Sequence, residues 1–77
     1  MTTDPKVIRS LARELLSRDT RNRIEMHLTT GATDLAVWRI IGNVDALFYM
    51  GRIGTSEIER AYKRLGVESK RFNTDQL

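Results

Sequence analysis

The stretch from Asp34 to Met50 constrains this chain of 77 residues more than any other. It reads DLAVWRIIGNVDALFYM, has the length of one long helix and is apolar on nearly every side, with only Arg39, Asn43 and Asp45 interrupting it. A helix with so little polar surface must pack against the rest of the chain or against a second copy. We therefore expect it to be the central element of the fold.

Amphipathic patterns on both sides of this stretch predict further helices. Asp4 is a suitable cap and Pro5 a suitable first residue for a helix that ends near residues 17–19. Its apolar face comprises Val7, Ile8, Leu11, Ala12, Leu15 and Leu16. We expect Glu14 and Arg18 to pair on this helix, being four residues apart.

The last helix follows a tight connection after Gly51, which ends the central helix. Ser56 and Glu59 form a predicted capping box, and Gly66 is the expected stop. The apolar face between them is made of Ile58, Ala61, Tyr62 and Leu65.

The segment from Thr20 to Thr30 has two interpretations. Residues 23–28 alternate polar and apolar, as in a half-buried strand. However, Asp19 or Thr20 can cap a helix, and Gly31 can stop one. Because no second segment alternates to pair with a strand, we favour a short helix.

A stripe of small and polar residues runs along the central helix, which Thr33 or Asp34 should cap. Its members are Arg39, Gly42, Asn43 and Ala46. Glycine costs roughly 1 kcal/mol against alanine inside a helix, so Gly42 needs a reason. We interpret the stripe first as the contact with a close neighbouring backbone in a slightly bent helix, and second as a groove for a ligand or partner.

These patterns predict an all-α fold, a compact bundle of about four short helices around the central apolar helix. Residues 1–66 form a single helical domain and residues 67–77 a basic, flexible tail. The alternative is one N-terminal strand in a ribbon-helix-helix-like dimer.

The chain lacks the residues that are characteristic of several function classes. The chain has no cysteine, one histidine (His27), scattered carboxylates and no phosphate-binding glycine loop. We expect no enzymatic activity, no cofactor and no metal. With neither a signal-peptide pattern nor an apolar run of about 20 residues, we expect a soluble cytoplasmic protein without a membrane partner.

Residues 47–65, LFYMGRIGTSEIERAYKRL, resemble two families. They are similar to the helical hairpin of SHOCT-type modules, which implies oligomerisation or attachment. They also resemble the turn and second helix of ribbon-helix-helix repressors. That resemblance implies a strand in which Ile24, Met26 and Leu28 point inward while Arg23, Glu25 and His27 face DNA.

A helix-turn-helix centred on Gly42 places Trp38 where a small residue belongs, and one centred on Gly54 places Arg60 in the core. Neither arrangement fits well. A divergent motif that uses the last helix as the reader remains an alternative.

Thirteen lysines and arginines against ten carboxylates give a net charge of +3. One basic cluster comprises Arg18, Arg21 and Arg23, and a second comprises Arg60, Lys63, Arg64, Lys70 and Arg71. The leading hypothesis is a small regulator of the kind encoded by phages or other mobile elements. It would be dimeric and bind DNA or the transcription machinery through the second cluster.

The rival hypothesis is a protein-binding adaptor or inhibitor. Its partner-binding residues would be Trp38, Phe48, Tyr49 and Met50, because the central helix has more apolar surface than two short neighbours can cover.

Overall fold

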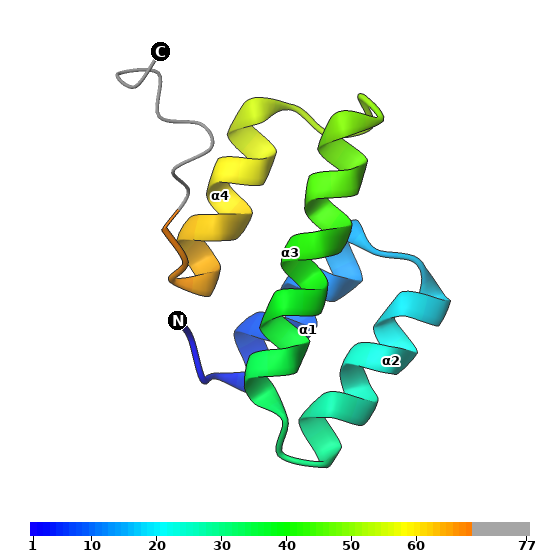
Figure 1. Ribbon diagram of the computed structural model, residues 1–77, viewed down its shortest axis with the longest axis vertical. Coiled ribbons are helices and arrows are strands. Elements are labelled where there is room, and N and C mark those ends of the chain that lie inside the picture. The colour runs from blue at the N-terminus through cyan, green and yellow to red at the C-terminus, as the bar shows by residue number, and fades with distance from the viewer. Residues whose placement is uncertain (69–77) are drawn as a thin grey trace.

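The computed structural model describes residues 1–68, and within that range the chain is an all-α bundle of four helices (Figure 1). They are α1 (Pro5–Leu15), α2 (Arg18–Thr29), α3 (Thr33–Tyr49) and α4 (Thr55–Leu65). The predicted fold class is thus confirmed. The predicted tail falls mostly on residues 69–77, outside the described residues, although Val67 still packs against the core.

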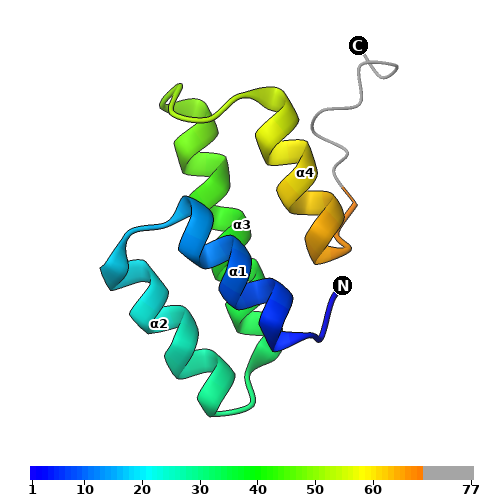
Figure 2. The ribbon, with the colours of Figure 1, turned by 180° about the vertical axis from the view of Figure 1, so that it is seen from behind.

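Helices α1 and α3 lie on opposite faces of the bundle. In Figure 1 α3 is in front of α1, in Figure 2 α1 is in front of α3, and α2 and α4 flank them on either side. Both α1 and α3 contact the three other helices. The apolar helix is therefore central, as predicted, but α1 shares that position with it.

All four helices contribute to one core. Helix α3 buries five side chains, and α1 and α4 each bury one amphipathic face, whereas α2 buries only Ile24. The largest fully buried side chains are Ile8, Leu11, Ile24, Val37, Ile40, Val44, Ile58 and Leu65. No charged or polar side chain is buried among the described residues.

The junction between α1 and α2 is tighter than predicted. Helix α1 starts as expected, with the Lys6 backbone N–H donating to Asp4 Oδ1 over 2.9 Å. Its last residue is Leu15, because Ser17 already caps α2 and accepts from the backbone N–H of Thr20. The caps predicted at Asp19 and Thr20 are therefore wrong. The predicted pair of Glu14 with Arg18 within one helix is also wrong.

The segment with two interpretations is helical, so the ribbon-helix-helix alternative is wrong. Ile24 is buried and Leu28 is half-buried, whereas Met26 between them is 67% exposed. Burial thus recurs every four residues, as in a helix, and not every two, as in a strand. Polar and apolar residues alternate in this segment, but buried and exposed positions do not.

Two other caps differ from the prediction. Thr33 is already the first residue of α3, after Ala32, which makes no side-chain cap hydrogen bond. Helix α4 starts after Gly54, whose backbone N–H donates to Glu57 Oε1 over 3.4 Å, so the Ser56–Glu59 box is wrong. The predicted stops hold, since Gly51 and Gly66 both have positive φ.

A close contact and a positive φ angle both restrict which residue can occupy position 66. The Thr2 backbone N–H donates to the Leu65 carbonyl over 2.7 Å, which holds the first residues beside the end of α4. A Cβ at position 66 would lie 3.3 Å from the Thr2 nitrogen. Glycine is therefore required here for two reasons, only one of which the sequence indicates.

Shortening Ile40 tests the core assignment. Ile40 is fully buried in α3, so Ile40→Val should cost about 0.5–1.5 kcal/mol of unfolding free energy and Ile40→Ala about 2–5 kcal/mol. Met26→Ala, at an exposed position, should change it by less than about 0.5 kcal/mol. Urea unfolding followed by circular dichroism measures all three, and equal losses for Ile40→Ala and Met26→Ala would contradict the assignment.

Candidate binding surfaces

The outward side of α3 is an exposed apolar surface, called here the α3 face. Its larger members are Leu35, Trp38 and Tyr49, whose exposed fractions are 56%, 53% and 69%. Gly42 and Ala46 are also exposed and lie between them on the helix. Spacings of three, four and seven residues place all five side by side, opposite the buried side of α3. A tryptophan half exposed within such a surface is typical of a protein interface.

Gly42, the smallest member of the stripe, has no close neighbour among the described residues. A Cβ built on Gly42 meets nothing within 4 Å apart from its own helix. The first interpretation, a contact with another backbone of the same fold, is therefore wrong. The second interpretation, a groove for a ligand or partner, stays a prediction, and the exposed position of Gly42 favours it.

Three of the four predicted partner-binding residues lie on the surface. Trp38, Tyr49 and Met50 are each more than half exposed. Phe48 is half-buried against the core, and its ring makes an edge contact with Tyr49 at 5.9 Å between centroids. Leu35 was missed, although its spacing of three and seven residues from Trp38 and Gly42 could have identified it.

Polar side chains border the α3 face on both sides. Toward α2, Arg39 Nε donates to His27 Nε2 over 3.1 Å, and Asn43 Nδ2 donates to the Arg39 carbonyl over 2.8 Å. Toward α4, the Tyr62 hydroxyl donates to Asp45 Oδ1 over 2.7 Å. The apolar surface therefore has a polar rim, which is the usual anatomy of a protein interface.

The basic residues of α4 have two different environments. Arg60 and Lys63 are exposed and form no ion pair with a described residue. Arg64 Nη1 lies 3.1 Å from Glu14 Oε2, and its Nη2 donates to Ser10 Oγ over 3.2 Å. Arg64 thus ties α4 to α1 and is less available to DNA than the sequence suggested. Lys70 and Arg71 lie outside the described residues.

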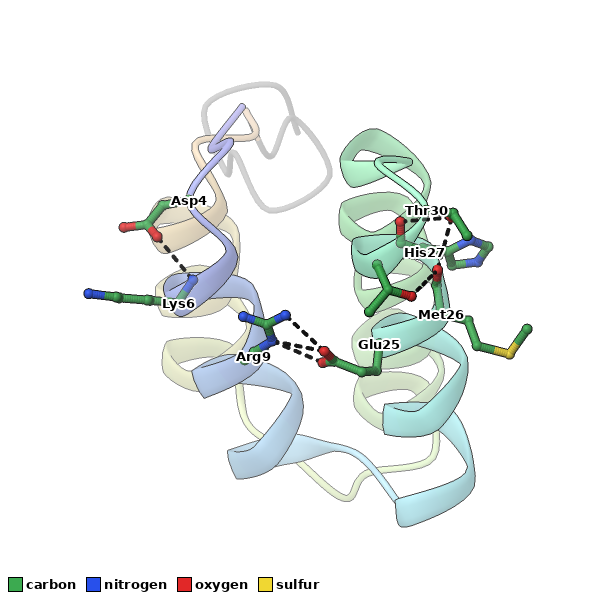
Figure 3. A network of polar contacts seen from close by, with 8 residues as sticks. Asp4, Lys6, Arg9, Glu25, Met26, His27 and Thr30 are labelled. Carbon is green, nitrogen blue, oxygen red and sulfur yellow. Dashed lines mark hydrogen bonds and ion pairs between the residues drawn. The ribbon is translucent and has the colours of Figure 1, made fainter.

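A second charged contact joins α1 to α2 (Figure 3). Arg9 Nε donates to Glu25 Oε2 over 2.9 Å and Arg9 Nη2 to Glu25 Oε1 over 2.8 Å, a bidentate arrangement. The hydrogen bond and then the charge of Glu25 raise the pKa of Arg9. The pKa of Glu25 is lowered, mainly by the hydrogen bond from Arg9.

The described residues contain no cluster of three or more histidine, cysteine, aspartate or glutamate side chains arranged to hold a metal ion. Nor does this part of the chain contain a helix of the length and apolarity needed to cross a bilayer. Comparison of the chain with known families, curated proteins and solved structures finds no match.

Removing Arg9 should raise the pKa of Glu25. Because the folded-state pKa of Glu25 is lowered, the pair stabilises the fold above the unfolded-state pKa, which is near 4.3. That contribution is lost as the pH falls through the folded-state pKa. An NMR titration of the Glu25 carboxyl carbon should show a higher pKa in Arg9→Gln than in the wild type.

Arg13→Gln is the matched control, because it removes the same charge from α1 without breaking an ion pair. The pair would have no role in the titration of Glu25 if both variants moved its pKa equally.

Proposed function

We propose that the protein is a small non-enzymatic regulator that acts by binding protein through the α3 face, and that its partner is a second copy of the chain. The exposed Trp38, next to Gly42, carries this proposal. The DNA-binding hypothesis now ranks second, because Arg64 is engaged in a contact between helices.

The α3 face is self-complementary in an antiparallel arrangement. If two α3 helices cross at Gly42, positions equally distant from it come together, so that Leu35 lies near Tyr49 and Trp38 near Ala46 of the second copy. A tryptophan side chain then enters a space left by glycine and alanine. Small residues at a helix crossing let two backbones approach closely.

The available area is sufficient for a weak dimer. Leu35, Trp38 and Tyr49 each keep more than half of their surface exposed, and an aromatic residue buries about 150–250 Å² when fully covered, so pairing of this face removes roughly 300–500 Å² per chain from water. The total approaches the roughly 1,000 Å² that a specific interface needs. We therefore expect a dissociation constant on the order of 1–100 μM.

Filling the space at Gly42 should weaken the dimer without harming the fold. Gly42→Leu has room in the monomer and should stabilise it by roughly 0.5–1 kcal/mol through helix propensity. The same side chain prevents close approach of a second helix, so the dimer affinity should fall at least about tenfold. Sedimentation equilibrium measures the affinity and urea unfolding measures the stability.

Ser56→Leu is the control, since it adds an exposed leucine to α4, away from the α3 face. It should leave the dimer affinity unchanged. A wild-type monomer at several hundred micromolar, or a Gly42→Leu dimer as tight as the wild type, would overturn the proposal.

The second candidate is a regulator that binds nucleic acid through α4. Arg60 and Lys63 are exposed and form no ion pair with a described residue, so they can contact phosphates without first breaking one. In this hypothesis the protein binds duplex DNA or a component of the transcription machinery.

Binding of random duplex DNA at several salt concentrations tests this candidate. Arg60→Ala/Lys63→Ala should weaken binding and reduce the slope of log affinity against log salt by about 2, because two phosphate contacts are lost. Lys6→Ala/Arg23→Ala removes the same charge from α1 and α2 and should change the slope less. Arg64 is left intact because of its contact with Glu14. Equal slopes for the two double variants would rule out a specific role for α4.

A further inference from the structure

A groove between α1 and α2 brings together four arginines that are distant from the α3 face. Arg9 and Arg13 come from α1, and Arg18 and Arg21 come from α2. The groove has a volume of about 270 Å³, and Glu25 is the one carboxylate among the residues that line it. The charge of Glu25 is already compensated by its bidentate contact with Arg9. The lining is therefore strongly positive.

Three of these arginines form no ion pair with any residue that the structure describes. The two ion pairs found within residues 1–68 join Arg9 to Glu25 and Arg64 to Glu14. The guanidinium groups of Arg13, Arg18 and Arg21 are thus not neutralised by a described residue. Like charges that line one groove repel one another, and a bound anion would offset that repulsion.

Arg21 gives the more specific indication. Its Nε atom is buried and has no hydrogen-bond partner in the protein. A buried donor without a partner destabilises the fold because it has lost its hydrogen bond to water, and such groups are rare enough to need an explanation. Turning the guanidinium toward the groove would expose Nε and Nη2 together, which is the pair of donors that binds two oxygens of one anion.

We propose that this groove is a phosphate-binding site in which Arg13, Arg18 and Arg21 hold one phosphate group. The planar guanidinium fork matches the spacing of phosphate oxygens, and arginine keeps its charge at any physiological pH. A groove of this size admits a single phosphate group with its nearest waters. The phosphate can be a free phosphate ion or a phosphodiester of a nucleic-acid strand, because both present the same oxygens.

The arginine Nε–H signals in ¹H–¹⁵N NMR spectra of the full chain test this site directly. The protein is titrated with sodium phosphate at constant ionic strength, and separately with a short single-stranded oligothymidylate. We expect saturable shifts of the Nε–H signals of Arg13, Arg18 and Arg21 with at least one of the two. Arg52 lies in the connection between α3 and α4 and should not shift.

Variants separate the site from general charge effects. Arg18→Gln, at an exposed position, and Arg21→Gln should each weaken binding about tenfold or more, as expected for loss of a charge-assisted contact. Arg21→Lys keeps the charge but loses the fork, and binding should be intermediate. Arg52→Gln removes the same charge elsewhere and should bind like the wild type. Circular dichroism verifies that each variant is folded.

The two titrations distinguish the sources of the phosphate. Saturation with inorganic phosphate at least as tight as with the oligonucleotide assigns the site to free phosphate, and much tighter saturation with the oligonucleotide assigns it to a nucleic-acid backbone. Shifts that rise linearly with both ligands, or that affect Arg52 equally, would overturn the site. The α3 face shares no residue with the groove, so that result would leave the proposed dimer unaffected.

Discussion

The packing of α1 and α3 against each other and against the two remaining helices is the interaction on which the rest of the structure depends. Helices α1 and α3 contribute eight of the thirteen residues of the buried hydrophobic core, and each of them contacts the three other helices. A fully buried isoleucine or leucine stabilises a fold by about 1.5–3 kcal/mol relative to an exposed one. A short chain has few such residues, and α1 and α3 hold half of those in the described part of the chain, namely Ile8, Leu11 and Ile40. Helices α2 and α4 pack on either side of α1 and α3.

The charged contacts on the surface act on this arrangement in a secondary way. Arg9 with Glu25 joins α2 to α1, and Arg64 with Glu14 joins α4 to α1. Exposed pairs of this kind contribute little to stability compared with the core. Their more important effect is on which arginine side chains can contact a ligand. They occupy Arg9 and Arg64, whereas Arg13, Arg18 and Arg21 form no ion pair with a described residue, and this difference is the basis of the proposed phosphate site.

The opposite placement of α1 and α3 separates two kinds of surface. The outward side of α3 is apolar with a polar rim, whereas the groove between α1 and α2 is lined by arginines. A dimer formed through the α3 face would leave both copies of the groove accessible. The proposed protein-binding and phosphate-binding activities are therefore compatible with one another, although neither requires the other.

The sequence by itself determined the fold class, the approximate number of helices and the residues at which most helices stop. The reason is that apolar periodicity and glycine stops are local signals, as the confirmed stops at Gly51 and Gly66 illustrate. The sequence also indicated that Trp38, Tyr49 and Met50 could be exposed, because the central helix is too apolar to be covered by short neighbours. The caps were predicted less well, since Ser17 and Gly54 compete with other suitable residues two or three positions away.

Only the tertiary structure decided what each side chain faces. It showed that Gly42 has no close neighbour, that Phe48 packs against the core and that Arg64 contacts Glu14 from fifty residues away. It also brought Arg9 and Arg13 to the same groove as Arg18 and Arg21. Such pairings depend on how helices cross, which a local pattern of residue types does not encode.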